Sequence, residues 1–328
     1  MRKILFRADA APHIGIGDLM SLINISKYFD ETYEKYFIIK DYKAGVELVK
    51  KYDLQNCFII DSTTVLKDEI TYINNFIDSY DIDILFFEIT ERKLSEYSGI
   101  SEKIKKVAVN FDGNILDDLD LVIDWDVEAH KFFDIKKYPN TRFLLGPEYV
   151  ILPKEFYSKK VKIRKFNLTN KKVLIAMGGA DEFDFTGKVV DSIIRFNLEI
   201  ELNVITGSGY EYKDILEARL NNSGVKYQIK HNITNMLDEY LACDIGIGAG
   251  GLTSSELVAT KVSPILIATY KHQIARCEYF DEKGWAKYLG YRELSDSELR
   301  DAITNPIKPL DKNIFNTSKI VELIDELF

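Results

Sequence analysis

The sequence predicts an α/β fold of two Rossmann-like domains that face each other across a cleft. With 328 residues the chain is long for one core, and domain-size statistics favour two units of roughly 150 residues each. Short apolar runs alternate with longer amphipathic stretches, which is typical of βα units on a parallel sheet. The series breaks off after Leu144-Leu145-Gly146-Pro147, passes a lysine-rich stretch from Lys154 to Lys165 and then starts again. We therefore place the domain boundary near residue 160, between domains 1–160 and 161–328.

The first half of the chain supplies one series of strands and helices. Buried parallel strands appear as short apolar runs, whereas helices repeat their apolar residues every three to four positions. The expected strands are Lys3–Arg7, Lys35–Ile39, Cys57–Ile60, Ile82–Glu88, Lys106–Phe111 and Leu119–Ile123. The expected helices are Leu19–Tyr28, Ala44–Lys51, Ile70–Ser79 and Ser95–Ile104.

The second half repeats this alternation. Its expected strands are Lys172–Met177, Glu201–Thr206, Val225–Ile229, Ile245–Ile247 and Ser263–Ile267. Its expected helices are Asp184–Phe196, Tyr212–Leu220, Asn232–Ala242, Thr253–Thr260 and Gln273–Lys283. The final segment, Thr317–Phe328, has the pattern of an amphipathic helix, and we expect it to pack back across the domains.

Composition excludes several classes of protein. The net charge of −9 argues against a nucleic-acid partner, because phosphate neutralisation needs a basic surface. No apolar run approaches the roughly 20 residues of a membrane-spanning helix, and the start of the chain lacks the apolar core of a signal peptide. We therefore expect a cytoplasmic protein without a transmembrane segment.

Three glycine turns follow strands and precede helices, and they are the strongest candidates for a binding site. They are Gly15-Ile16-Gly17-Asp18, Gly178-Gly179-Ala180-Asp181 and Gly248-Ala249-Gly250-Gly251-Leu252-Thr253. In open α/β sheets, ligands bind outside the carboxyl ends of the strands, where these turns lie. Glycine allows close approach of a diphosphate, and the following helix offers free N–H groups. No turn matches GxGxxG or GxxxxGK[ST], which argues against a nicotinamide enzyme or an ATPase.

Two of the polar residues in these turns also have purely structural interpretations. Asp18 stands where a helix N-cap belongs, and Asp is among the best N-caps. Thr253-Ser254-Ser255-Glu256 matches the capping box, in which Glu256 would bond back to the backbone. The acidic pairs Asp117-Asp118 and Asp124-Trp125-Asp126 have the pattern of solvated loops.

Read together, these motifs resemble the enzymes that hydrolyse a UDP-linked sugar in pseudaminic acid synthesis, and the spore-coat polysaccharide proteins. More distantly they resemble the peptidoglycan GlcNAc transferase. The resembling segments are Phe6-Arg7-Ala8-Asp9, Ile14-Gly15-Ile16-Gly17, Leu145-Gly146-Pro147-Glu148-Tyr149, Lys154-Glu155-Phe156, Met177-Gly178-Gly179-Ala180-Asp181, Gly250-Gly251-Leu252-Thr253-Ser254-Ser255-Glu256-Leu257, Pro264 and Gln273. These families have the GT-B architecture, which is two Rossmann-like domains with the nucleotide mainly on the second.

The resemblance implies a division of roles between the two domains. Nucleotide-binding residues would be Gly178, Gly179, Gly250, Gly251, Leu252, Thr253 and Glu256, with Glu256 on the ribose hydroxyls. Substrate-binding residues would be Gly15, Gly17, His13 and Gln273. The favoured carrier is UDP, with CMP left open, and helix N–H groups rather than a divalent metal or other cofactor would neutralise the leaving diphosphate.

One position departs from the resembling hydrolases and decides the predicted reaction. They carry histidine directly after the first GxG, whereas this chain has Asp18. Some inverting GT-B glycosyltransferases place an aspartate there as the base, and a carboxylate near its usual pKa is ionised and able to accept a proton. We therefore predict a glycosyltransferase that passes a sugar to a surface glycan or protein-linked sugar, with Asp18 as the base. His13, five residues upstream, is an alternative base.

Two other functions stay open at this point. The first is hydrolysis of a nucleotide sugar, with Asp18 directing water instead of an alcohol. The second is a catalytically silent protein that keeps only the nucleotide pocket. We expect the choice of sugar to depend on first-domain loops such as Glu88–Arg92 and Phe111–Asn114.

Overall fold

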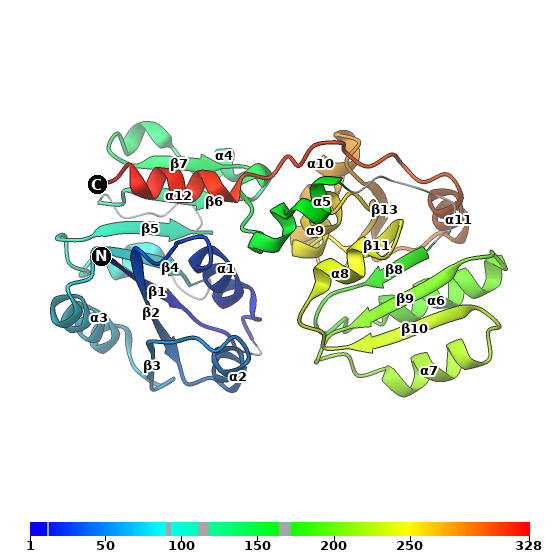
Figure 1. Cartoon of the computed structure of the whole chain (residues 1–328), viewed down its shortest axis with the longest axis horizontal. Helices are drawn as coiled ribbons and strands as arrows, with labels where there is room; N and C mark the ends of the chain where they lie inside the picture. Colours follow the sequence, from blue (N-terminus) through cyan, green and yellow to red (C-terminus); the bar gives the residue numbers. More distant parts are fainter. Residues whose placement is uncertain (12, 90–92, 111–117, 164–171) are drawn as a thin grey trace. The chain divides into compact units, whose positions relative to one another are not determined.

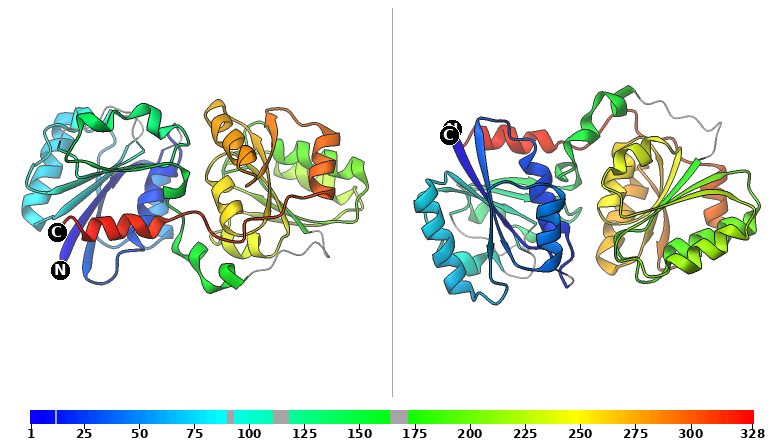
Figure 2. Two further views of the ribbon diagram at one scale, coloured as in Figure 1. Left: turned by 90° about the horizontal axis from the view of Figure 1, so that it is seen from above. Right: turned by 60° about the horizontal axis from the view of Figure 1, so that its bottom comes forward.

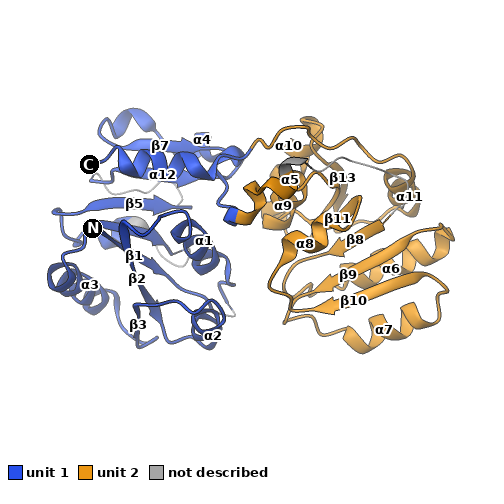
Figure 3. Cartoon of the chain, in the orientation of Figure 1, with its two compact units in different colours: residues 1–154, 315–328 blue, residues 155–314 orange. Residues whose placement is uncertain are grey.

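The structure is a computed structural model that describes residues 1–11, 13–89, 93–110, 118–163 and 172–328. The chain divides into two compact units (Figure 3), and each is an α/β fold with its own parallel sheet. Unit 1 comprises Met1–Lys154 and Phe315–Phe328, and unit 2 comprises Glu155–Ile314. The division therefore falls a few residues before the boundary expected near residue 160.

Unit 1 contains a seven-stranded parallel sheet of order β3-β2-β1-β4-β5-β6-β7. Its strands are β1 (Arg2–Ala8), β2 (Tyr33–Lys40), β3 (Cys57–Ile60), β4 (Ile84–Glu88), β5 (Lys105–Val109), β6 (Leu121–Asp124) and β7 (Arg142–Leu145). The chain moves outward from β1 to β3, then crosses back so that β4 pairs with the other side of β1. The order of strands therefore reverses between β1 and β4.

The helices of unit 1 cover both faces of this sheet (Figure 1). They are α1 (Gly17–Ser26), α2 (Lys43–Lys51), α3 (Leu66–Tyr80), the short α4 (Ala129–Phe132) and the 3-10 turns η1 (Leu94–Tyr97), η2 (Ile135–Lys137) and η3 (Pro147–Tyr149). Because side chains alternate along a strand, Leu5 joins the cluster that contains Ile73 and Phe76 of α3, whereas Phe6 stacks on Phe37 at 5.0 Å between ring centroids. Both faces of the sheet are thus covered by apolar side chains.

The last helix, α12 (Thr317–Asp325), belongs to unit 1, and its end lies near the start of β1 (Figure 2), where Arg2 contacts Asp325 at 3.4 Å. Thr317 donates its hydroxyl to the Val150 carbonyl at 3.0 Å, and the Asn316 amide donates to the Glu148 carbonyl at 2.7 Å. Ile320 and Ile324 are fully buried. These contacts fix the chain terminus to the first unit.

Unit 2 contains a six-stranded parallel sheet of order β10-β9-β8-β11-β12-β13. Its strands are β8 (Lys172–Ala176), β9 (Glu201–Thr206), β10 (Lys226–His231), β11 (Ile245–Ala249), β12 (Ser263–Ala268) and β13 (Lys287–Tyr291). Here the order reverses between β8 and β11, which pair side by side. The sequence expectation of two parallel α/β units is confirmed.

Two sets of helices enclose this second sheet. They are η4 (Lys154–Tyr157), α5 (Lys159–Ile163), α6 (Phe185–Phe196), α7 (Lys213–Asn221), α8 (Met236–Leu241), α9 (Leu252–Ala259), η5 (Lys271–Gln273), α10 (Ile274–Glu282) and α11 (Asp296–Thr304). Residues of α6, α7 and α11 form one apolar cluster with the sheet, including Val189, Leu216 and Leu299. Leu257 of α9 and Phe280 of α10 are buried as well.

The helix expected over Ser95–Ile104 is wrong, because only η1 forms there. The side chain of Asn74 holds the backbone that follows: its amide donates to the Gly99 carbonyl at 2.8 Å and its oxygen accepts from the Ser101 amide at 2.9 Å. The sequence also failed to predict β7, β13 and α11. Within the described ranges, no helix combines the length and apolar character needed to cross a membrane.

Candidate functional site

Each sheet has one place where the strand order reverses, and the candidate residues gather at these two places. At such a point the loops from neighbouring strands run to opposite faces and leave room for a ligand outside the carboxyl ends. In unit 2 the turns after β8 and β11 carry the predicted nucleotide-binding glycines. In unit 1 the loop after β1 leads to Asp18, and β4 ends in Glu88.

The glycine turn after β8 is open on its outer side. Gly178 has a φ of +102°, and an added Cβ at Gly178 or Gly179 would meet no atom within 4 Å. The inner side of the turn is held by the loop after β9, where the Gly209 amide donates to the Gly179 carbonyl at 3.1 Å. A Cβ on Gly207 would come within 2.2 Å of that carbonyl oxygen, so this third glycine allows the two loops to meet. The role of Gly207 was not predicted from the sequence.

The two glycines after β11 have different surroundings. A Cβ on Gly250 would lie 2.4 Å from Cys277 Sγ and 2.8 Å from Gln273 Cβ, so Gly250 permits close packing against α10. A Cβ on Gly251 would meet only Gln273 Nε2, at 3.8 Å. Gln273 itself accepts through Oε1 from the Thr269 amide at 2.9 Å, which fixes its side chain within the loop after β12. Gly251 is therefore the member of the pair that leaves space for a ligand.

Helix α9 begins directly after this turn. Its N-cap is Gly251, and no side chain caps it. Leu252 and Thr253 lie in its first turn, half-buried. The capping-box interpretation is therefore wrong: Thr253 lies inside the helix, and the Glu256 carboxylate bonds to a side chain of another helix. The amides at the start of α9 provide the kind of donors that bind phosphate oxygens.

Glu256 is positioned by a buried tyrosine. Tyr240 of α8 has no exposed surface, and its hydroxyl donates to Glu256 Oε2 at 2.7 Å. Burial raises the pKa of Glu256, the hydrogen bond from Tyr240 opposes this shift, and the charge of Glu155 adds to it. One carboxylate oxygen is thus engaged from within unit 2. Tyr240 was not predicted from the sequence.

Asp181, at the end of the glycine turn after β8, has a structural role. Its two carboxylate oxygens accept from the amides of Phe185 and Thr186 at 2.9 and 2.7 Å. Asp184, the N-cap of α6, accepts from the Gly187 amide at 3.0 Å. Both carboxylates therefore bind the start of α6 and fix the position of the turn.

In unit 1, the loop after β1 is closed by backbone hydrogen bonds. The Gly15 amide donates to the Ala11 carbonyl at 2.8 Å, the Ala11 amide donates to the Gly15 carbonyl at 3.1 Å, and Gly15 has a φ of +79°. Gly17 is the first residue of α1, and Asp18 follows in its first turn. The N-cap interpretation of Asp18 is wrong, because the N-cap is Ile16 and no side-chain capping bond forms. Asp18 is buried, with 9% of its surface exposed.

The structure places three further polar residues in the neighbourhood of Asp18. Glu88 ends β4 with 1% exposure, Asn110 follows β5, and Asp124 ends β6 with 7% exposure. The Asn110 amide donates to Glu88 Oε1 at 2.9 Å. Asp124 is therefore not in a solvated loop as expected, because the preceding apolar run carries it into the sheet.

Burial raises the pKa of Glu88 well above its usual range, and the charge of Asp18 raises it further. Glu88 was expected to lie in a first-domain loop, which is wrong, because it is the last residue of β4. Residues 90–92 and 111–114 of the expected loops lie outside the described residues. The sequence signal that could have revealed the burial of Glu88 is its position as an acidic residue at the end of an apolar run.

His13 lies at the exposed part of the loop after β1. Its ring packs edge-on against Tyr42 at 5.6 Å between centroids. The base of the same loop is held by a buried ion pair, in which Arg7 donates to Asp9 at 2.7 Å and to Glu69 at 2.9 Å. This buried ion pair therefore fixes the start of the loop that leads to Asp18.

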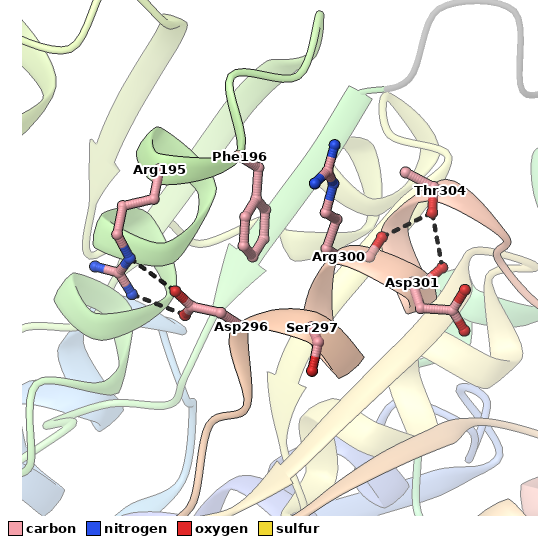
Figure 4. A pocket seen from close by; sticks show the side chains of 7 residues that line it. All are labelled: Arg195, Phe196, Asp296, Ser297, Arg300, Asp301 and Thr304. Carbon is pink, nitrogen blue, oxygen red and sulfur yellow. Dashed lines mark hydrogen bonds and ion pairs between the residues drawn. The ribbon is translucent and has the colours of Figure 1, made fainter.

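A surface cavity of about 420 Å³ lies elsewhere in unit 2 (Figure 4). It is lined by Arg195, Phe196, Asp296, Ser297, Arg300, Asp301 and Thr304. Arg195 forms a two-pronged ion pair with Asp296, at 2.7 Å for each bond. The cavity lies at the last turn of α6, whereas the glycine turn precedes the first turn of that helix, which is about 16 Å away. It is therefore distinct from the candidate nucleotide site. No group of three acidic, histidine or cysteine side chains in the described ranges is arranged to hold a metal.

Comparison with known structures establishes the fold class. MurG of Acinetobacter baumannii superimposes with a TM-score of 0.66 at 14% identity, over 99% of this chain and 100% of that one. Anabaena Alr3699/HepE, solved in complex with UDP, gives 0.62 at 13% identity, over 99% of both chains. The chain therefore has the GT-B fold.

Sequence comparisons add a family match for the second unit. Residues 173–324 match the glycosyltransferase family 28 C-terminal domain. The chain is 25% identical over 163 residues to the spore coat polysaccharide biosynthesis protein SpsG of Bacillus subtilis, which is 48% of this chain and 47% of SpsG. It is 28% identical over 142 residues to the UDP-N-acetylglucosamine--N-acetylmuramyl-(pentapeptide) pyrophosphoryl-undecaprenol N-acetylglucosamine transferase of Azoarcus sp. (strain BH72), which is 42% of this chain and 40% of that enzyme. The chain spans less than half the length of each of these relatives.

Proposed function

We propose that this protein is an inverting glycosyltransferase that takes a sugar from a UDP-linked donor and passes it to a hydroxyl of a glycan or protein-linked sugar. The observation that carries the proposal is that each sheet has suitable polar groups at the point where its strand order reverses. Unit 2 has open glycine turns and a helix N-terminus at its switch point, and unit 1 has a buried carboxylate at the corresponding point. The family 28 match of unit 2 and the transferase among the relatives support the same class of substrate.

In the proposed reaction, the acceptor hydroxyl gives its proton to Asp18 while its oxygen attacks the anomeric carbon. A new carbon–oxygen bond forms, the bond from the anomeric carbon to the phosphate oxygen breaks, and UDP leaves with the electron pair. Attack from the face opposite to UDP inverts the configuration. The amides of Gly251, Leu252 and Thr253 would stabilise the charge that develops on the diphosphate, and Glu256 would accept hydrogen bonds from the ribose.

The same groups can direct water instead of an alcohol, which would make the protein a nucleotide-sugar hydrolase. The two reactions differ in whether UDP release depends on an acceptor. The spore coat relative supports a role in polysaccharide synthesis, and the N-acetylglucosamine transferase among the relatives supports the transfer reaction. A nucleotide pocket without turnover would correspond to the silent binding protein.

UDP release from UDP-N-acetylglucosamine and other UDP-sugars tests these alternatives, with and without a panel of saccharide acceptors. We expect release only when an acceptor is present, and a loss of at least a hundred-fold in Asp18→Asn, because a general base contributes 10²–10⁴-fold. Acceptor-independent release would replace transfer by hydrolysis. Binding of UDP without release under any condition would refute both reactions.

A further inference from the structure

Glu88 lies deeper in unit 1 than Asp18, and both belong to the same switch point. Glu88 is the last residue of β4 and pairs in register with Ala8 of β1, the strand whose loop leads to Asp18. Its exposure is 1%, compared with 9% for Asp18. A ligand at this edge of the sheet therefore meets Asp18 first.

The carboxyl group of Glu88 is only half satisfied. Oε1 accepts from the Asn110 amide at 2.9 Å, whereas Oε2 is buried and has no hydrogen-bond partner among the described residues. A buried carboxylate oxygen without a donor is unfavourable, since burial removes the water that would solvate its charge. A proton on Oε2 removes this penalty and turns the atom into a donor.

Four polar groups act on Glu88, and they act in opposite directions. Burial raises the pKa of Glu88 most, and the charges of Asp18 and Asp124 raise it further, whereas the hydrogen bond from Asn110 and the nearby Ser21 hydroxyl lower it. None of the four groups is a cation, and the Ser21 hydroxyl donates to the Gly17 carbonyl at 3.0 Å.

The carboxyl groups of Asp18 and Glu88 at this switch point have different electrostatic surroundings. Asp18 lies in the first turn of the ten-residue helix α1, where the partial positive charge of the helix N-terminus stabilises a carboxylate. Glu88 ends a buried strand and has no such helix. One shared proton therefore belongs on Glu88, and the negative charge belongs on Asp18.

We propose that Glu88 is a positioning residue that retains a proton on Oε2 at the switch point that also carries Asp18, so that this site holds one ionised carboxylate. This inference rests on the proposed function, in which Asp18 is the base. When Glu88 ionises at alkaline pH, a second negative charge appears beside the base and opposes an anionic diphosphate substrate. Activity should therefore fall at high pH because of Glu88.

The first test measures stability and needs no substrate. The chain contains two tryptophans, Trp125 in unit 1 and Trp285 in unit 2. A Trp285→Phe background leaves Trp125 as a fluorescent reporter of unit 1 during urea unfolding. Four variants in this background are compared between pH 5 and 9: the parent, Glu88→Gln, Asp18→Asn and the double variant.

The direction in which stability changes with pH follows from proton binding to Glu88. A raised pKa in the folded state gives stability that is present below pH 4.5 and lost as pH rises through the folded pKa. Glu88→Gln removes this loss of stability. The folding equilibrium constant of the variant, divided by that of the parent, should therefore rise by up to ten-fold for each pH unit between pH 4.5 and the folded pKa. Asp18→Asn removes the neighbouring charge, so the gain from Glu88→Gln should be smaller in that background.

An equal gain in both backgrounds, or none, would overturn the inference. If Glu88→Gln does not fold, Asp18→Asn alone still decides, since it should flatten the dependence of stability on pH. When coupling appears but no UDP-sugar is turned over, the proton assignment stands and the proposed function fails.

The second test uses the pH profile of acceptor-dependent UDP release. In Glu88→Gln the alkaline descent of kcat/KM should disappear or move to higher pH. Glu69→Gln is the matched control: Glu69 is fully buried in the same unit but pairs with Arg7. It should lower stability and leave the alkaline descent in place. Loss of the descent in both variants would indicate a general structural effect and contradict the role of Glu88.

Discussion

Replacing Glu256 with alanine should separate two effects, one on folding and one on nucleotide binding. Tyr240 is fully buried and its hydroxyl donates to Glu256 at 2.7 Å, so the alanine variant removes a charged acceptor from a buried hydroxyl. Loss of such a hydrogen bond costs about 1–3 kcal/mol of folding free energy. Loss of the bonds from a carboxylate to the ribose costs roughly 1.5–3 kcal/mol of binding free energy, which is about ten-fold or more in Kd.

The assay combines urea unfolding of unit 2 with calorimetric titration of UDP, in a Trp125→Phe background that leaves Trp285 as the reporter. Tyr240→Phe removes the buried hydroxyl, so adding it to Glu256→Ala should recover most of the lost stability but none of the lost affinity. Glu256→Gln retains an acceptor for Tyr240 and should fold normally, with weaker UDP binding because the charge is gone. Wild-type UDP affinity in a folded Glu256→Ala variant would refute the ribose assignment.

Three further predictions concern the turns. Gly250→Ala should destabilise unit 2 by about 1–3 kcal/mol in urea unfolding, because its Cβ would overlap Cys277 Sγ; unchanged stability would contradict the packing role. Gly251→Ala has room for its methyl group, so it should fold normally yet bind UDP roughly ten-fold more weakly by calorimetry; equal affinity would place the diphosphate elsewhere. Asp181→Ala removes the acceptor of two amides at the start of α6 and should cost about 1–2 kcal/mol of stability, measured by thermal unfolding, and an unchanged Tm would argue against the capping role.

The alternation of apolar runs predicted the central strand Glu201–Thr206 and also the edge strand Cys57–Ile60, both with the observed bounds. The edge strands β7 and β13 were missed because their apolar runs are short: β7 has three apolar residues after Arg142, and Gly290 interrupts β13. The helix α11 is rich in charged residues, and its three buried residues become evident only when α6 packs against it.

At the candidate site, the glycine turns were visible in the sequence because special backbone conformations need glycine. Their division into packing and open positions was not visible, since it depends on Cys277 and Gln273 of a later helix and turn. Glu88 and Tyr240 were missed for a similar reason. Each acquires its importance from burial beside a residue that is distant in the sequence.

The most direct test of the central claim is calorimetric titration of the wild-type protein with UDP, UMP, CMP and GDP. We expect UDP to bind with one-to-one stoichiometry and more tightly than UMP, because the turns at 178–179 and 250–253 would hold the diphosphate. We also expect weaker binding of CMP and GDP. If no nucleotide binds, the chain shares only the fold with nucleotide-sugar enzymes, and the proposed reaction is contradicted.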